Sequence, residues 1–472
     1  MAVADSPVPD LADRATACAE RLRAADRVLL ASHLDADGLT SAAVASTALA
    51  RAGIDHEVVF EKQLDDAAIE GIAATGYETV LFTDFGSGQL DAIAEHEAAG
   101  KFTPVIADHH QPADADTELH LNPLLEGING ASELSGAGAS YVLARALEGS
   151  DGDNRDLAAL AVVGAVGDMQ AVGGELVGAN AGIVEEGIAA DVLVEGTDLS
   201  LYGKQTRPLP KLLEYATEVP IPGISNDQAG ATRFLEELGL DLKRQGEWRT
   251  WADLSDDERQ TVASALVQRA VTRGVPAGKI ESLVGTTYTL TAEPSGTELR
   301  DASEFSTLLN ATARYERADV GLAVCLGERE GPLEEARTLL ANHRRNLSQG
   351  LDLVKDRGVT QSEYVQYFDA GGAIRETIVG IVAGMALGTD GVDPDKPIIA
   401  FADADGETKV SSRATGPLVG RGVDLSVVMR EAAQSVGGDG GGHDIAAGAT
   451  VPAGEETAFI EAADAIVADQ LG

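Results

Sequence analysis

The sequence predicts an α/β fold in which two α/β domains are separated by a stretch interpreted as helical. Three observations predict it. Short runs rich in Val, Leu and Phe alternate with helical stretches over residues 27–107, which indicates right-handed crossovers and a doubly wound, mostly parallel sheet. The alternation resumes after residue 299. At 472 residues the chain is too long for one typical core, so two or three domains are expected.

The N-terminal domain is expected over residues 1–194. Its predicted strands are residues 27–32, 56–60, 79–84 and 103–107, and its first predicted helices are residues 38–52, 64–74 and 89–99. Helices then dominate from residue 136 to about residue 190 and include the apolar run 160–167. In open parallel sheets, ligands bind outside the carboxyl ends of the strands. Residues that directly follow these strands are therefore candidates for a site.

Residues 195–295 contain both tryptophans and several prolines, and we interpret them as a helical linker or inserted module. A smaller C-terminal α/β domain is expected over residues 296–472. Its predicted helices are residues 304–314, 332–356, 374–387 and 425–436, and its predicted strands are residues 320–326, 363–368 and 397–402. The strand 397–402 is expected to continue into a hairpin with Asp405 and Gly406 at its turn.

The composition is strongly acidic, with a formal net charge of -42 and a pI near 4.3. Such a charge ordinarily argues against a polyanionic substrate. The acids are nevertheless spread along the whole chain, as in proteins from extreme halophiles, and at ~1 M salt the Debye length is only about 3 Å. We interpret the charge as an adaptation to salt; an acidic surface that docks a basic protein is the alternative.

No stretch reaches the ~18 apolar residues of a membrane-spanning helix, and the N-terminus lacks the pattern of a secretory signal. A cytoplasmic protein without a membrane partner is expected. Cys18 and Cys325 lie far apart in the sequence, which predicts neither a disulfide framework nor a zinc site.

Carboxylates and imidazoles follow several apolar runs. They occur in the segment 33–38 (HLDADG), at the end of the strand 79–84, in the segment 108–110 (DHH), and after the run 160–167. Hard divalent ions prefer carboxylate oxygen, and imidazole shifts the preference towards manganese. Two such ions ~3.5–4 Å apart can share a carboxylate and neutralise the charge on phosphate oxygens. The candidate ligands are His33, Asp35, Asp37, Asp84, His109 and Asp168.

Each motif alone has an ordinary structural explanation. The segment 33–38 could form a turn and a helix cap, residues 108–110 a solvated loop, and Asp84 and Asp168 the ends of helices. The segment 403–406 (DADG) repeats the Asp-x-Asp-Gly pattern without the histidine, where a hairpin turn explains it. Four motifs in this order, each at the end of an apolar run, favour a two-metal phosphoester hydrolase.

The order of these motifs resembles the DHH phosphoesterase superfamily, in particular the archaeal RecJ-like single-strand nucleases, some of which attach to the GINS replication complex. The resemblance implies a DHH catalytic domain and a DHH-associated C-terminal domain. It also implies two manganese ions, with magnesium as an alternative. One ion would be surrounded by His33, Asp35, Asp84 and Asp168, and the other by Asp37, Asp84 and His109. Asp108 would orient a histidine, and His110 would face the scissile phosphate as a charge stabiliser or proton donor.

The C-terminal domain contains the segment 440–443 (GGGH), which resembles the glycine-rich signature of the associated domain. Glycine lets backbone approach a phosphate closely, so Gly440, Gly441 and Gly442 with His443 are candidates for substrate binding; a flexible loop after a helix is the alternative. Ser412 and Arg413 resemble the family's phosphate-contacting strand end, and a guanidinium can hold phosphate bidentately.

Two further segments resemble family motifs less closely. In the segment 310–314 (NATAR), Ala313 replaces the usual glycine, which puts a function for Asn310 and Arg314 in doubt. The segment 135–138 (SGAG) also resembles a family motif, although helix capping alone would explain its serine.

The sequence therefore predicts a manganese-dependent phosphodiesterase, a RecJ-like exonuclease on single-stranded DNA or RNA, acting in the groove between its two domains in DNA replication or repair. GINS is a candidate partner. One alternative is a small-substrate member of the superfamily that hydrolyses short oligonucleotides, cyclic dinucleotides or pyrophosphate. The other is a replisome scaffold with little activity. The presence of all six candidate ligands argues against the scaffold.

Overall fold

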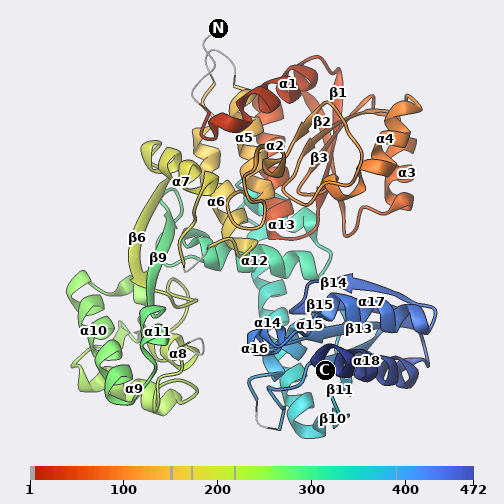
Figure 1. The fold of residues 1–472 in the computed structure, drawn as a ribbon. Coiled ribbons are helices and arrows are strands. Elements are labelled where there is room, and N and C mark those ends of the chain that lie inside the picture. Colours follow the sequence, from red (N-terminus) through yellow and green to blue (C-terminus); the bar gives the residue numbers. More distant parts are fainter. Residues whose placement is uncertain (1–5, 149–151, 172–173, 217–218, 390, 405) are drawn as a thin grey trace. The chain divides into compact units, whose positions relative to one another are not determined.

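The structure is a computed structural model that describes residues 6–148, 152–171, 174–216, 219–389, 391–404 and 406–472 (Figure 1). The chain forms two compact units, residues 1–337 and 338–472, which divide within the long helix α14 (Pro332–Arg357). Their mixed α/β composition confirms the predicted fold class. The domain boundaries at residues 194 and 295 stay predictions.

A five-stranded parallel sheet forms the centre of the first unit, in the order β2-β1-β3-β4-β5. Its strands are β1 (Arg27–His33), β2 (Asp55–Glu61), β3 (Thr79–Thr83), β4 (Thr103–Ala107) and β5 (His120–Leu121). The strand order reverses between β1 and β3, and such reversals are where doubly wound sheets bind ligands. His33 ends β1 and Asp84 follows β3, so both residues lie at this point.

Helices cover both faces of this sheet, which explains why its strands are apolar runs. Helices α3 (Asp66–Ala74) and α4 (Leu90–Ala98) pack on one face, where Phe82 and Ile106 meet Ile69 and Ile93 (Figure 1). On the other face lie α2 (Ala36–Arg51) and α5 (Gly136–Ala146), with α1 (Ala12–Arg23) against α5. The four predicted strands and three predicted helices of this region are all present, with ends shifted by one or two residues.

Three helices complete the support of α2. Helix α6 (Ala158–Gly167) packs against α2 and α5, α7 (Ala179–Ala189) packs against α6, and α12 (Ala302–Arg314) packs against both α6 and α2. The approach of α6 is close because residue 164 is glycine: a Cβ there would lie 2.5 Å from the Cβ of Ala137. These contacts bring the end of α6 next to the start of α2.

Residues 320–326 are not a strand, so that prediction is wrong: α13 (Ala318–Cys325) is a helix packed on α2. A Cβ at Gly321 would lie 2.7 Å from Leu39 Cδ1. The segment is short, apolar and rich in valine, features that suit a buried helix as well as a strand, and the tertiary contact decides.

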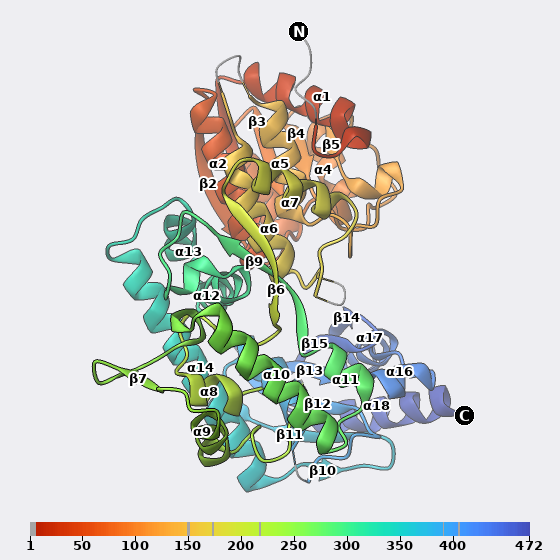
Figure 2. The same ribbon diagram turned by 90° about the vertical axis from the view of Figure 1, so that its left-hand side faces the viewer.

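Two antiparallel strands, β6 (Leu193–Leu199) and β9 (Val284–Leu290), form a ribbon that carries the middle segment (Figure 2). Between them lie α8 (Leu209–Glu214), α9 (Gln228–Glu237), the two-residue strands β7 (Lys243–Arg244) and β8 (Glu247–Trp248), α10 (Asp256–Thr272) and α11 (Ala277–Glu281). These helices share a core of their own around Phe234, Trp251 and Leu266. The segment therefore has a core of its own, and the strands at its two ends are paired; its interpretation as an inserted module stays a prediction.

The second unit contains a mixed six-stranded sheet in the order β10-β11-β12-β13-β15-β14. Its strands are β10 (Thr360–Gln361), β11 (Gln366–Asp369), β12 (Ile398–Ala404), β13 (Glu407–Arg413), β14 (Asp439–Gly442) and β15 (Ala446–Pro452), and its helices are α15 (Glu376–Ala386), α16 (Gly416–Gly420), α17 (Leu425–Ser435) and α18 (Glu456–Leu471). β12 and β13 form the expected hairpin, although Asp405 lies outside the described residues. The glycine segment 440–442 is part of the edge strand β14 and is not the flexible loop that was the alternative.

In the part of the chain that the structure describes, no helix combines the length and the apolar character needed to cross a membrane.

Candidate metal centre

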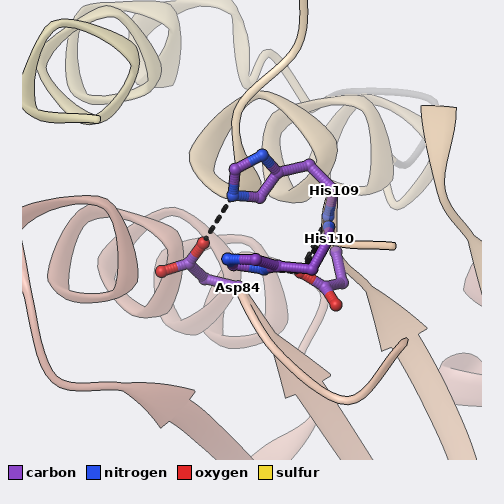
Figure 3. Close-up of side chains that lie close together, drawn as sticks. Asp84, His109 and His110 are labelled. Carbon is purple, nitrogen blue, oxygen red and sulfur yellow. Dashed lines mark hydrogen bonds and ion pairs between the residues drawn. The ribbon is translucent and has the colours of Figure 1, made fainter. Parts of the chain in front are cut away.

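The carboxyl ends of β1, β3 and β4 bring histidines and carboxylates together (Figure 3). Asp84 is at the centre of this cluster and is 1% exposed. Its Oδ2 is 3.5 Å from Nδ1 of His33, and its Oδ1 is 3.3 Å from Nε2 of His109. Among the described residues, neither oxygen accepts a hydrogen bond of good geometry. A buried carboxylate in this state is costly unless a cation neutralises it.

The backbone at Asp84 is in the left-handed region, with φ of 60°. This conformation is costly for a residue with a Cβ, and it is held by the hydrogen bond from the Asp84 amide to the Ala107 carbonyl. It turns the chain sharply at the end of β3, so that the carboxylate points back over the sheet edge.

The candidate ligands form two groups that meet at Asp84. His33, Asp35 and Asp84 can bring one ligand atom each within 4.8 Å of one another, and so can Asp37, His109 and Asp168. The resemblance implied that Asp168 belongs with His33 and Asp35. In the structure its Oδ2 is 3.8 Å from Nε2 of His109, so it lies with the other group.

Helix ends hold the carboxylates of the segment 33–38. Asp35 is the N-cap of α2, and its Oδ1 accepts a hydrogen bond of 2.9 Å from the Gly38 amide. Asp37 is in the first turn of α2, and its side chain reaches the start of α5, where its two oxygens accept hydrogen bonds from the amides of Gly136 at 2.7 Å and Ala137 at 3.0 Å. The partial positive charge of a helix N-terminus stabilises a carboxylate there and fixes its orientation.

Glycines let the backbone approach this cluster. A Cβ at Gly136 would lie 2.3 Å from Asp84 Oδ1, and a Cβ at Gly164 would lie 2.4 Å from Asp37 Oδ1. Ser135 accepts a hydrogen bond of 3.2 Å from the Gly138 amide and therefore caps α5, as helix capping predicted. The segment 135–138 thus supports the site with backbone.

His109 is oriented by the residues behind it. Its Nδ1 donates to the Gly130 carbonyl at 2.6 Å, which leaves Nε2 facing the carboxylates. The buried amide of Gln170 donates to the same carbonyl at 2.8 Å and to Asp168 Oδ2 at 2.9 Å, and Asn180 donates to Gln170 Oε1 at 2.7 Å. Gln170 therefore ties two candidate ligands to one framework, as the supporting residues of metal sites do.

Sequence reasoning missed Gln170, Asn180 and Gly130. The only signal was the position of Gln170, two residues after Asp168 in a stretch that follows a buried helix. Single polar residues of this kind carry no motif, and their partners are distant in the sequence.

Asp108 and His110 form a pair beside the cluster. Asp108 is fully buried, and its oxygens accept hydrogen bonds from the amides of Ser87 and His109 and, at 2.8 Å, from Nδ1 of His110. With these bonds the carboxylate serves to orient His110. The His110 side chain is 54% exposed, and its Nε2 is the ring nitrogen not used by this bond.

The charges in the cluster shift the protonation of its members. Burial alone lowers the pKa of His109, but its ion pair with Asp84 and the surrounding carboxylates outweigh this effect and raise the pKa to about 11. Burial and the charge of Asp84 raise the pKa of Asp37. Burial raises the pKa of Asp84, but its contacts with His109 and His33 lower it overall. The side chains thus carry a surplus of negative charge that a divalent cation would neutralise.

The donor set fits hard or borderline divalent cations. Three carboxylates and two imidazoles lie around the buried carboxylate of Asp84, which accepts no hydrogen bond of good geometry among the described residues. Carboxylate and imidazole together suit manganese and magnesium, whereas the described residues offer no thiolate here, the softer ligand favoured by zinc structural sites.

The structure places the predicted substrate residues of the second unit along β13 and β14. Ser412 is fully buried and donates to the Ala447 carbonyl at 3.1 Å, so its hydroxyl serves the sheet. Arg413 ends β13 and lies over α15, where a Cβ at Gly380 would come within 2.7 Å of its guanidinium. Gly440 and Gly441 are half-buried, and Gly442 and His443 are exposed.

Asn310, whose function the sequence left in doubt, reaches the cluster from α12. Its Oδ1 accepts a hydrogen bond of 3.1 Å from the Ala36 amide, between Asp35 and Asp37. Arg314 is exposed.

The chain matches three families of domains. Residues 27–165 match the DHH family, N-terminal domain, residues 201–284 match the DHH-CID domain, and residues 363–469 match the DHHA1 domain. An uncharacterized protein of Methanocaldococcus jannaschii is 29% identical over 455 residues, which is 93% of each chain.

Solved structures share the fold. RecJ of Thermus thermophilus in complex with Mn²⁺ has a TM-score of 0.61 at 18% identity, over 99% of this chain and 56% of that one, so this chain spans little more than half its length. An exonuclease RecJ bound to manganese has a TM-score of 0.58 at 19% identity, over 99% and 96% of the two chains. CDC45 of Entamoeba histolytica has a TM-score of 0.68 at 11% identity, over 97% and 99%. The fold is thus shared by nucleases and by CDC45.

Proposed function

From the premise that this chain is a RecJ-like protein of the DHH family, we propose that it is a manganese-dependent phosphodiesterase that degrades single-stranded DNA or RNA from an end. The observation that carries the proposal is the double group of ligands around Asp84, whose buried oxygens accept no hydrogen bond of good geometry among the described residues.

Two divalent cations would be held by His33, Asp35 and Asp84 and by Asp37, His109 and Asp168, with Asp84 between the groups. When bound, they supply Lewis acidity, lower the pKa of the attacking water and neutralise charge on the phosphate oxygens. RecJ of Thermus thermophilus has been solved in complex with Mn²⁺ and with Mg²⁺, and a second exonuclease RecJ has been solved bound to manganese. We therefore propose manganese, with magnesium as the alternative.

His110 has a separate role in this proposal. Its bond to Asp108 raises its pKa and favours the protonated ring. A protonated, half-exposed imidazole beside the cluster can donate a hydrogen bond to a phosphate oxygen or a proton to the leaving oxygen. Asp108 holds the ring in place and does not itself touch the substrate.

Substrate binding by the second unit is also part of the proposal. Arg413, the backbone of Gly440, Gly441 and Gly442, and His443 would bind phosphates, while Ser412 would support this strand end through its bond to Ala447. We further propose a role in DNA replication or repair with GINS as partner and an acidic surface adapted to high salt, in the cytoplasm.

Two other functions make different predictions. A small-substrate enzyme of the same superfamily would hydrolyse dinucleotides or pyrophosphate and leave long strands intact. A scaffold, suggested by the CDC45 fold, would bind metal and partners without hydrolysis. The intact set of six candidate ligands favours an enzyme.

The test is degradation of DNA and RNA single strands labelled at either end, with Mn²⁺ in molar KCl, by the wild type and by Asp37→Ala with His109→Ala. Stepwise shortening by the wild type alone supports the exonuclease and reveals its polarity and preferred sugar. Cleavage of a dinucleotide alone would support the small-substrate enzyme. Binding of Mn²⁺ without any cleavage would overturn the hydrolase.

A further inference from the structure

A cavity of about 560 Å³ opens beside the metal centre on the side of β2 and α3. Its inner wall includes His33, Asp84 and His110. Its outer wall is formed by the segment that follows β2, by the segment that follows β3 and by residue 111. A group attached to a phosphate at the metal centre would therefore extend into this space.

Three glutamines line the cavity: Gln63, Gln89 and Gln111. Gln63 and Gln111 are exposed, and Gln89 is half-buried. Within the described ranges, none of the three side-chain amides has a hydrogen-bond partner in the protein. An amide offers both donors and an acceptor, so three of them around one space suit a ligand with a mixed pattern of donors and acceptors.

The remaining lining is apolar or balanced in charge. Leu64 and Phe85 contribute apolar surface. Lys62 is the one lysine or arginine that lines the cavity, and its ammonium lies 3.7 Å from Glu316, while the carboxylate of Asp65 also lines the space. Such a lining does not select a second phosphate, which calls for clustered cations.

We propose that this cavity binds the nucleoside next to the scissile phosphate and that Gln89 and Gln111 contact its base. The inference rests on the proposed function and adds to it a site for the terminal residue of the strand. The volume suits one nucleoside, since pockets for small ligands measure ~300–1,000 Å³. Glutamine amides recognise base edges through paired donor and acceptor, and Phe85 adds an apolar surface.

The test compares complete single strands with strands whose terminal nucleotide lacks its base. The abasic nucleotide is placed at one end in one set and at the other end in a second set. The variants are Gln89→Ala, Gln111→Ala and their combination, with Gln268→Ala on the exposed face of α10 as the matched control. We expect wild-type kcat/KM to be about tenfold lower for the strand with the abasic end, as for the loss of one or two hydrogen bonds. The double variant should cleave the complete strand at the abasic rate and leave cleavage of the abasic strand unchanged.

Equal wild-type rates on the complete and the abasic strand would overturn the inference, while the proposed exonuclease function would be unaffected. A double variant that slows both strands equally would also overturn it, because the glutamines would then support the metal centre. Binding gives an independent reading: fluorescence anisotropy with the Asp37→Ala chain should show tighter binding of the complete strand. Equal affinities would refute the base site even if no strand were cleaved, whereas absent cleavage alone refutes only the exonuclease.

Discussion

Gly136 lies directly against Asp84 at the start of α5, and the metal centre depends on its missing side chain. A Cβ there would lie 2.3 Å from Asp84 Oδ1 and 2.7 Å from Asp84 Cβ. The same backbone amide binds Asp37. One residue thus sets the distance between two candidate ligands.

We expect Gly136→Ala to displace Asp84, to weaken Mn²⁺ binding at least tenfold and to destabilise the fold by about 1–3 kcal/mol, the usual cost of overpacking. The matched control is Gly71→Ala on α3, where a Cβ meets nothing within 4 Å; it should be neutral or stabilise by roughly 0.5–1 kcal/mol. Calorimetric Mn²⁺ titration and urea unfolding measure both effects. Unchanged Mn²⁺ affinity in Gly136→Ala would contradict this role.

Gln170 supports the candidate metal ligands without being one of them, so its replacement tests that supporting role by itself. Gln170→Leu keeps the volume but removes the donors to Asp168 and to the Gly130 carbonyl. Loss of such supporting bonds typically reduces metal affinity 10–100-fold, so we expect a Kd for Mn²⁺ raised by about that factor. Gln268→Leu on α10 is the control. If Gln170→Leu bound Mn²⁺ like the wild type, Gln170 would be a packing residue only.

His120 makes stability depend on pH. Burial lowers its pKa to about 4, and its Nε2 lies 2.9 Å from Ser87 Oγ. Between pH 6.5 and 4 the unfolded chain binds this proton and the folded chain does not, so stability is lost as the pH falls through this window, by up to ~3 kcal/mol. His120→Gln should flatten the dependence of the unfolding free energy on pH there. An unchanged slope would show that other groups dominate.

At the scale of elements, β1, β3 and β4 were predictable because apolar runs end abruptly at polar residues. The ribbon of β6 and β9 was not, because most of its side chains are exposed or partly exposed without a regular alternation, and its two strands are about 90 residues apart. The predicted strand at residues 320–326 was wrong for a different reason. The segment is apolar, as a buried strand would be, but the packing of Gly321 on Leu39 favours a helix.

The edge strand β14 offers a prediction at this scale. A Cβ at Gly440 would lie 2.7 Å from the Met429 carbonyl of α17, whereas a Cβ at Gly441 meets nothing within 4 Å. Gly440→Ala should therefore destabilise the protein by about 1–3 kcal/mol, and Gly441→Ala should leave stability unchanged. Thermal unfolding of the two variants measures this difference. Equal melting temperatures would mean that β14 moves away from α17 at little cost.

At the scale of the whole molecule, the net charge is -42, and the acidic side chains repel one another when the salt concentration is low. The Debye length falls from ~10 Å at 0.1 M to ~3 Å at 1 M salt. We expect the melting temperature to rise between 0.1 M and 2 M KCl. Sucrose at matched osmolality should give a smaller rise, because it does not screen charge. A melting temperature that falls with KCl would contradict an adaptation to salt.

The sequence allowed the α/β class and the gathering of the candidate ligands to be predicted, because both depend on local patterns and on a familiar order of motifs. The grouping of Asp168 with His109, and the framework of Gln170 and Gly130 behind them, depend on α6 packing against α2 through Gly164. Contacts of this kind, between segments distant in the sequence, produce no periodic pattern of residues from which they could be predicted.

The ribbon of β6 and β9 has an evolutionary consequence. Leu199 is paired with Val284, so the inserted module begins and ends at neighbouring points, and a two-residue turn can close the ribbon in its place. Ancestral chains could thus gain, lose or exchange the module as a cassette without rerouting the parallel sheet. A chain shortened in this way retains all six carboxylates and imidazoles of the centre, so the module and the metal centre are genetically separable.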